Sequence, residues 1–106
     1  MDQKEKKLVA AALASFEHTT GLKAMFQSTS PHDESVSDGL IKIEHQEILK
    51  TFVIEAKTRV SRAIVAALKA EAAHFQKKLV LITDYVTPPI ADLLQEMDLC
   101  FIDAAG

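Results

Sequence analysis

The fold is decided by the stretch Ile48-Leu49-Lys50-Thr51-Phe52-Val53-Ile54-Glu55-Ala56-Lys57. Its middle is a run of aromatic and β-branched residues, which favours a strand. The preceding residues 40–44, Leu-Ile-Lys-Ile-Glu, predict a second strand, and residues 45–47 are short enough to join the two as a hairpin. The sequence therefore predicts a hairpin whose second strand ends in a charged pair, Glu55 and Lys57.

A helix and one further strand are predicted before the hairpin. Residues 3–19 carry apolar side chains at three- and four-residue spacing, and Gly21 is placed to end this helix in a left-handed cap. Residues 22–28 alternate weakly and predict a first strand. Residues 29–39 have the composition of a loop. The first half thus predicts a helix followed by a meander of three strands.

Helices and strands alternate after the hairpin. Residues 60–78 are rich in alanine and predict the strongest helix, and residues 79–82 form an apolar run typical of a strand buried on both faces. A helix over residues 88–97 and another buried strand over residues 99–102 follow. This alternation predicts an α/β fold with a mixed central sheet. We expect one domain over residues 1–106, truncated at its C-terminal end because no element closes the last strand.

Composition narrows the class of protein. The 106 residues are 48% apolar and 25% charged, the balance of a globular domain. No apolar run approaches the roughly 18 residues that cross a bilayer, and the charged start lacks the apolar region of a signal peptide. The single cysteine, Cys100, excludes an internal disulfide and, between Leu99 and Phe101, is expected to be buried. We expect a cytoplasmic protein that does not bind membranes.

The charges are unevenly distributed, although the net charge is only −3. Residues 57–78 carry six basic side chains and one acidic side chain. This basic segment can meet the phosphates of DNA, with Arg59, Arg62, Lys77 and Lys78 as the candidate contacts. A solvated helix face is the simpler alternative for the same pattern.

Two acidic residues and a lysine form a candidate catalytic group. Asp38 lies just before one strand of the hairpin, separated from it by Gly39. Glu55 and Lys57 end the other strand, on a shared face because they are two residues apart. Two carboxylates and the Ala56 carbonyl oxygen are the hard ligands that suit Mg²⁺ or Mn²⁺. Lys57 can orient a metal-bound water or stabilise the charge that develops on a phosphate.

These three residues and the order of elements resemble the PD-(D/E)xK nuclease superfamily, although Ser37 stands where the strict motif has proline. The resemblance implies a restriction-endonuclease-like α-β-β-β-α-β core with an extra helix and strand. It implies divalent-metal-dependent hydrolysis of DNA phosphodiesters, with Asp38 and Glu55 as metal ligands and Lys57 as the catalytic lysine. The DNA-contacting residues would be Arg59, Ser61 and Arg62, and Glu17 would be a further acidic residue.

A second, narrower resemblance covers the C-terminal part. Residues 81–94, Leu-Ile-Thr-Asp-Tyr-Val-Thr-Pro-Pro-Ile-Ala-Asp-Leu-Leu, and residues 101–106, Phe-Ile-Asp-Ala-Ala-Gly, are similar to AbiEi-type antitoxins of type IV toxin–antitoxin systems. This implies an alternative without catalysis: a transcriptional regulator that binds DNA or a toxin protein. A homodimer formed through the strand at residues 99–102 is a third possibility.

The remaining polar residues give weaker signals. Asp84 and Asp103 each follow an apolar strand run, where α/β proteins often carry site residues, and both equally suit turn capping. The four histidines are scattered without zinc-ligand spacing.

Overall fold

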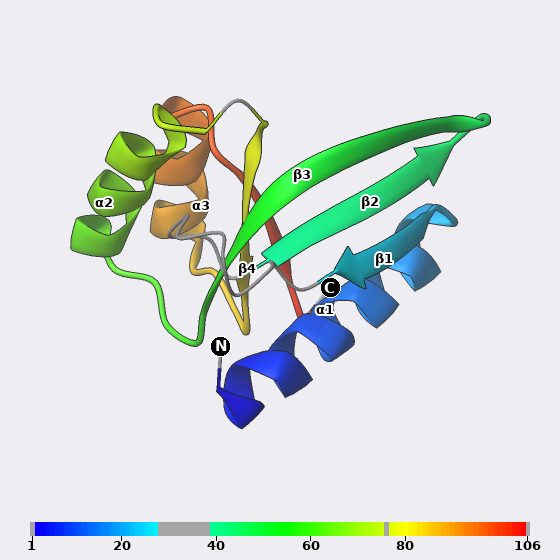
Figure 1. Ribbon diagram of the computed structural model, residues 1–106. Coiled ribbons are helices and arrows are strands. Elements are labelled where there is room, and N and C mark those ends of the chain that lie inside the picture. The colour runs from blue at the N-terminus through cyan, green and yellow to red at the C-terminus, as the bar shows by residue number, and fades with distance from the viewer. Residues whose placement is uncertain (1, 28–38, 76, 106) are drawn as a thin grey trace.

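A mixed sheet with the strand order β1-β2-β3-β4-β5 runs through the part of the chain that the computed structural model describes, residues 2–27, 39–75 and 77–105 (Figure 1). The strands are β1 (Lys23–Gln27), β2 (Gly39–His45), β3 (Ile48–Lys57), β4 (Leu79–Thr83) and β5 (Cys100–Asp103). The helices are α1 (Gln3–Thr20), α2 (Arg62–Ala72) and α3 (Pro88–Glu96). The predicted α/β class and mixed sheet are confirmed.

The strand pairs are antiparallel in the first half of the chain and parallel in the second. β1, β2 and β3 pair antiparallel, whereas β3 with β4 and β4 with β5 pair parallel, each through a helical crossover. A two-residue turn joins β2 to β3, and both of its residues, Gln46 and Glu47, have positive φ angles of 52° and 67°. Two-residue hairpins need such angles to match the strand twist. The predicted meander and hairpin are therefore present.

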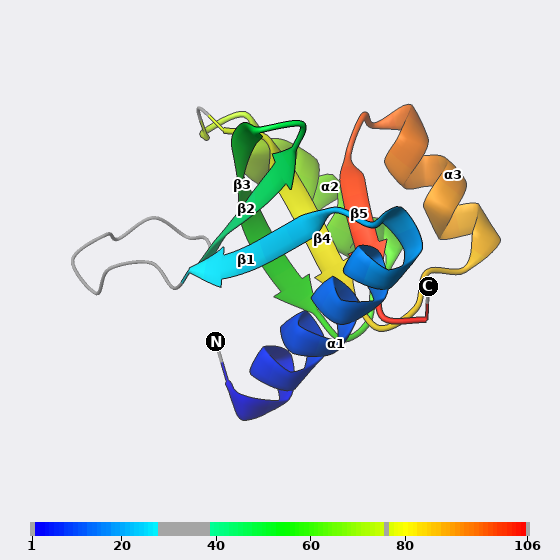
Figure 2. The same ribbon diagram turned by 90° about the vertical axis from the view of Figure 1, so that its right-hand side faces the viewer.

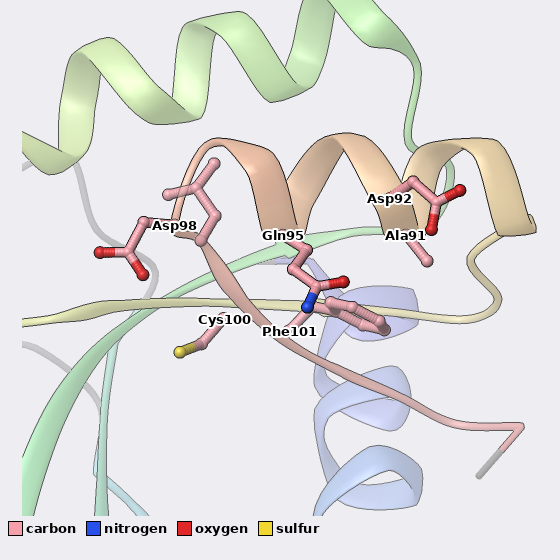
Figure 3. A pocket seen from close by; sticks show the side chains of 7 residues that line it. Ala91, Asp92, Gln95, Asp98, Cys100 and Phe101 are labelled. Carbon is pink, nitrogen blue, oxygen red and sulfur yellow. The ribbon is translucent and has the colours of Figure 1, made fainter.

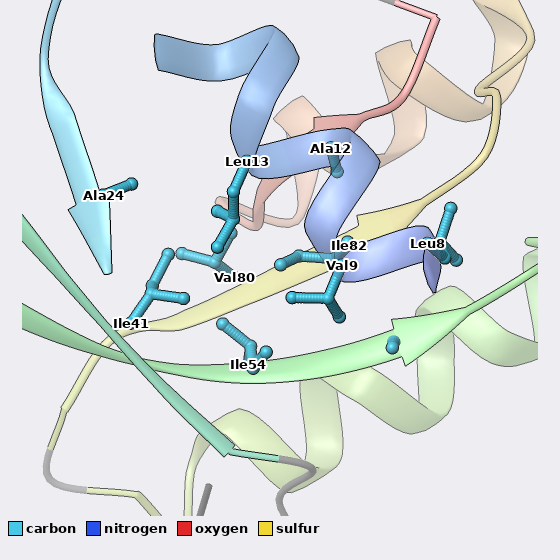
Figure 4. Packing of buried hydrophobic residues seen from close by; sticks show 10 residues of the cluster. Leu8, Val9, Ala12, Leu13, Ala24, Ile41, Ile54, Val80 and Ile82 are labelled. Carbon is cyan, nitrogen blue, oxygen red and sulfur yellow. The ribbon is translucent and has the colours of Figure 1, made fainter. Parts of the chain in front are cut away.

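One face of the sheet packs against α1. Leu8, Val9, Ala12 and Leu13 recur at helical spacing on one side of α1, which produces a buried stripe. This stripe meets alternate residues of the strands, and Figure 4 shows it over Ile41, Ile54, Val80 and Ile82. Gly21 ends α1 as predicted, with φ 74° and its N–H bonded to the Glu17 carbonyl oxygen at 2.8 Å.

The opposite face of β4, β5 and the C-terminal half of β3 packs against α2 and α3, so this part of the sheet is covered on both sides (Figure 2). Val65 and Leu68 of α2 and Leu94 of α3 form a second core with the strand residues whose side chains point to that side, among them Val53 and Leu81. Every residue of β4 is buried. The continuous apolar run at residues 79–82 is thus explained, because a strand between two covered faces has no solvent side.

The alanine-rich helix is shorter than predicted. Its sequence favours a helix over residues 60–78, but α2 ends at Ala72 and is followed by turn bonds from His74 N to Glu71 O and from Phe75 N to Ala72 O. Phe75 packs onto the second core, and Lys78 O accepts a bond from Val53 N at the start of the β3–β4 pairing. Tertiary packing therefore overrides the helix propensity of residues 73–75 and 77–78.

The last strand is not buried, contrary to prediction. β5 lies at the edge of the sheet, its residues are partly or fully exposed, and the Cys100 side chain is exposed. An edge strand lacks a neighbour on one side, which the apolar sequence of this segment does not reveal.

We predict a sharp contrast between two isoleucines of this sheet. Ile82 has no exposed surface, whereas Ile48 is 59% exposed. Ile82→Ala is expected to lower the free energy of unfolding by about 2–5 kcal/mol, because it removes buried methyl groups and leaves a cavity. Ile48→Ala serves as the matched control and should change it by less than about 0.5 kcal/mol. Denaturant unfolding checks both values, and equal losses would contradict the assigned core.

Candidate active site

The carboxyl ends of β3, β4 and β5 meet at one edge of the sheet, at the bottom of Figure 1, because these three strands are parallel. α2 and α3 begin at this edge, since each helix follows directly on a strand that ends there. Their first N–H groups carry partial positive charge, and such strand edges are where open α/β sheets bind ligands. We call this region the carboxyl edge.

Glu55 and Lys57 both lie at the carboxyl edge and share the face that packs against α2 and α3. Ala56 faces the α1 side and is fully buried, as the two-residue periodicity predicts. Glu55 is only 3% exposed, because a helix layer covers this face also, and its Oε1 atom is shielded from solvent. Lys57 is half-buried. A shielded carboxylate followed by a more open ammonium group therefore ends the strand.

Asp38, the other predicted metal ligand, lies outside the described residues. Its neighbour in sequence, Gly39, is described and pairs with Ile54, the residue before Glu55. That the carboxylates of Asp38 and Glu55 lie close together therefore stays a prediction.

One of the two predicted metal ligands lies among the described residues. Glu55 offers the hard oxygen ligand that Mg²⁺ and Mn²⁺ prefer, in a shielded position. Over residues 2–27, 39–75 and 77–105, no group of three or more His, Cys, Asp or Glu side chains forms a metal site. Of the two predicted ligands, Glu55 therefore lies at the carboxyl edge, and the part of Asp38 stays a prediction.

Family models, characterised proteins and solved structures gave no match to this chain. Among the described elements, no helix is both long and apolar enough to cross a membrane. The case for a function consequently depends on the residues of the carboxyl edge.

The three predicted DNA-contacting residues lie just beyond Lys57. Arg59 is exposed in the β3–α2 connection, and Arg62 is exposed in the first turn of α2. Ser61 is the N-cap of α2, and its Oγ accepts a hydrogen bond from Ile64 N at 3.3 Å. The structure thus gives Ser61 a capping role and leaves both guanidinium groups at the carboxyl edge.

Lys77 and Lys78, the other two candidate DNA contacts of this segment, are placed differently. Both are exposed immediately before β4, at the amino end of that strand. The four candidate DNA contacts of the basic segment therefore divide into an arginine pair at the carboxyl edge and a lysine pair at the opposite end of the sheet.

Glu17 lies far from the candidate site. Its Oε2 accepts a hydrogen bond from Ala24 N at 3.1 Å, which stabilises the turn between α1 and β1. Through the strand register Ala24 aligns with Lys50, five residues and so about 16 Å along β3 from Glu55. The structure assigns Glu17 to that turn.

Thr83 is a site residue that the sequence did not single out. It ends β4 in register between Lys57 of β3 and Asp103 of β5, and on the face of Glu55 and Lys57 by alternation along the strand. It has no exposed surface, and within the described part of the chain its Oγ1 has no hydrogen-bond partner. The feature of the sequence that could have identified Thr83 is a hydroxyl side chain at the end of an otherwise apolar strand.

A separate hollow lies between α3 and β5. Figure 3 shows Gln95 and Phe101 facing into it, and its rim includes Asp92 and Asp98. These two aspartates do not belong to any group of metal-ligating side chains among the described residues. The hollow therefore adds nothing to the predicted catalytic group.

We predict that removing the buried hydroxyl of Thr83 stabilises the fold. An unsatisfied buried hydroxyl costs about 1–3 kcal/mol, and valine has nearly the same shape without it. Thr83→Val should raise the free energy of unfolding by about 1 kcal/mol. Thr51→Val, at a half-buried threonine of β3, is the control and should change it by less than about 0.5 kcal/mol. Destabilisation by Thr83→Val would show that the hydroxyl is used within the folded domain.

Proposed function

We propose that this protein is a divalent-metal-dependent endonuclease that hydrolyses phosphodiester bonds of DNA at the carboxyl edge. The observation that carries the proposal is the pair formed by a shielded carboxylate, Glu55, and a half-buried ammonium group, Lys57, on one face at the end of β3. Acidic oxygens beside a lysine are a combination suited to phosphoryl chemistry, because both the metal ion and the ammonium group offset negative charge.

The arrangement of elements supports the same proposal. The chain runs α1-β1-β2-β3-α2-β4, with an antiparallel β1-β2-β3 meander and a parallel β4, before α3 and β5 are added. This order is similar to the α-β-β-β-α-β core of restriction-endonuclease-like proteins. We infer that the chain has this core with one extra helix and strand.

Each residue of the edge receives a role. Asp38 and Glu55 would hold Mg²⁺ or Mn²⁺, which when bound supplies a water of lowered pKa and neutralises phosphate charge. Lys57 would stabilise the charge that develops on the phosphate during hydrolysis. Arg59 and Arg62 would bind neighbouring phosphates, and Ser61 keeps the N-terminus of α2 ordered beside them.

We expect Lys57→Ala to reduce metal-dependent nicking of supercoiled plasmid by about 100-fold or more, because it removes the cation that stabilises the transition state. Glu55→Gln, which keeps the shape of the side chain, should abolish the response to Mg²⁺ and Mn²⁺. Lys50→Ala is the matched control, since Lys50 is an exposed lysine of the same strand at its other end.

Gel analysis over a titration of each metal gives the nicking rate, and circular dichroism shows that each variant is folded. Nicking by Lys57→Ala at the rate of Lys50→Ala would refute the catalytic proposal.

A second candidate function is a DNA-binding regulator without nuclease activity, comparable to the AbiEi-type antitoxins. It is favoured by the exposure of Arg59 and Arg62 beside the first turn of α2, which suits phosphate contacts whether or not cleavage follows. In this case the ligands would be DNA and a toxin protein, and the acidic residues would be vestigial.

DNA binding through the arginine pair gives a quantitative expectation. Removing both guanidinium groups in Arg59→Ala/Arg62→Ala should weaken binding to a DNA duplex and reduce the magnitude of the slope of log K against log salt by about 2, one for each lost phosphate contact. Lys77→Ala/Lys78→Ala removes the same charge at the other end of the sheet and should leave the slope nearly unchanged. Fluorescence anisotropy at several salt concentrations measures both. An equal reduction of the salt slope in both double variants would contradict this expectation and indicate non-specific electrostatic attraction between the protein and DNA.

A further inference from the structure

Thr83 stands between two charged residues in one row of the sheet. The register aligns Lys57 with Thr83 and Thr83 with Asp103, and neighbouring strands are about 4.8 Å apart. Lys57 and Asp103 are both half-buried, and Thr83 between them is fully buried. A hydroxyl group therefore lies between a cation and an anion at the edge where the proposed chemistry occurs.

The Thr83 hydroxyl has unused bonding capacity. A hydroxyl donates one hydrogen bond and accepts up to two, yet Oγ1 makes none with the described residues. Every other residue of β4 is aliphatic and buried, so packing alone would be served as well by valine. A polar atom held in this position without a partner is suited to a bond that forms only when a ligand is bound.

We propose that the Thr83 hydroxyl is a positioning group for Lys57, accepting a hydrogen bond from its Nζ and donating one to the Asp103 carboxylate when DNA is bound. Only this orientation suits a hydroxyl between an ammonium group and a carboxylate, because the ammonium group has no acceptor and the carboxylate has no proton. The lysine side chain is long enough to reach the hydroxyl by rotation, and catalytic hydrogen bonds commonly tighten only in the substrate complex. This inference rests on the proposed nuclease function.

The consequence is a role in the chemical step. A fixed ammonium group stabilises developing charge better than a mobile one, since no reorganisation is needed in the transition state. Thr83 itself does not reach the DNA, because its hydroxyl is shielded from solvent. Loss of the hydroxyl should therefore lower kcat and leave KM unchanged.

The test compares single-turnover and steady-state cleavage of a labelled DNA duplex by Thr83→Val and Thr83→Ser. Thr83→Val is expected to lower kcat about tenfold at constant KM, whereas Thr83→Ser, which keeps the hydroxyl, should stay within about twofold of the wild type. Asp103→Ala should resemble Thr83→Val, and Asp103→Asn, which retains an acceptor oxygen, should have the smaller effect. Thermal unfolding verifies that Thr83→Val is at least as stable as the wild type.

A double-mutant cycle with Lys57 isolates the positioning role. If Thr83 acts through Lys57, then Thr83→Val in the Lys57→Ala background should have no further effect on the single-turnover rate. A tenfold loss in that background as well would overturn the inference, as would wild-type kcat in Thr83→Val while Lys57→Ala is inactive. A wild-type protein that does not cleave, or Lys57→Ala with full activity, would instead refute the proposed function, and the inference with it.

Discussion

The parallel pairing of β3 with β4 is the constraint on which the rest of the structure depends. It places Lys78 O within hydrogen-bond distance of Val53 N and aligns Lys57 with Thr83 at the other end of the two strands. A parallel pair needs a crossover, so α2 must lie over one face, and the strands become buried on both sides once α1 covers the other. The same pairing brings the charged end of β3 to the edge where two helices begin. The parallel pairing of β3 with β4 therefore determines both the layered fold and the position of the candidate site.

Coverage of both faces explains the unusual position of Glu55. On a sheet with one open face, residues 53, 55 and 57 would point to solvent, and a glutamate there would be unremarkable. Here the face is closed by α2 and α3, so the carboxylate is shielded while the final Lys57 is half-open. Burying a carboxylate is costly unless it is bonded or binds a cation. A shielded carboxylate next to a half-buried lysine, at the edge where two helices begin, is the physical basis for assigning a function to this end of the strand.

Much of the fold could be predicted from the sequence, because the signals were local. The apolar stripe of α1, formed by Leu8, Val9, Ala12 and Leu13, predicted this helix, and Gly21 predicted where it ends. The unbroken apolar run at residues 79–82 predicted a strand that is covered on both faces. Predictions failed where a distant contact decided the outcome. The end of α2 depends on the packing of Phe75 and on the start of β4, and the exposure of β5 and Cys100 depends on having no further strand beside it among the described residues.

The candidate site shows the same division. Glu55 and Lys57 were recognisable by their spacing on one strand, whereas Thr83 could be found only through the register that sets it beside Lys57. Ser61 and Glu17, which the family resemblance marked as functional, have hydrogen bonds that cap α2 and fasten the α1–β1 turn. Polar side chains near helix ends can bond to nearby backbone groups, and a motif cannot separate that role from ligand binding.

The most direct measurement is a crystal structure obtained with Mn²⁺, using the anomalous signal of the metal. The account predicts one anomalous peak bridged by the carboxylates of Asp38 and Glu55, within about 2.0–2.4 Å of an oxygen of each, with Lys57 beside it. A structure in which those two carboxylates face away from each other, with no metal between them, would contradict it.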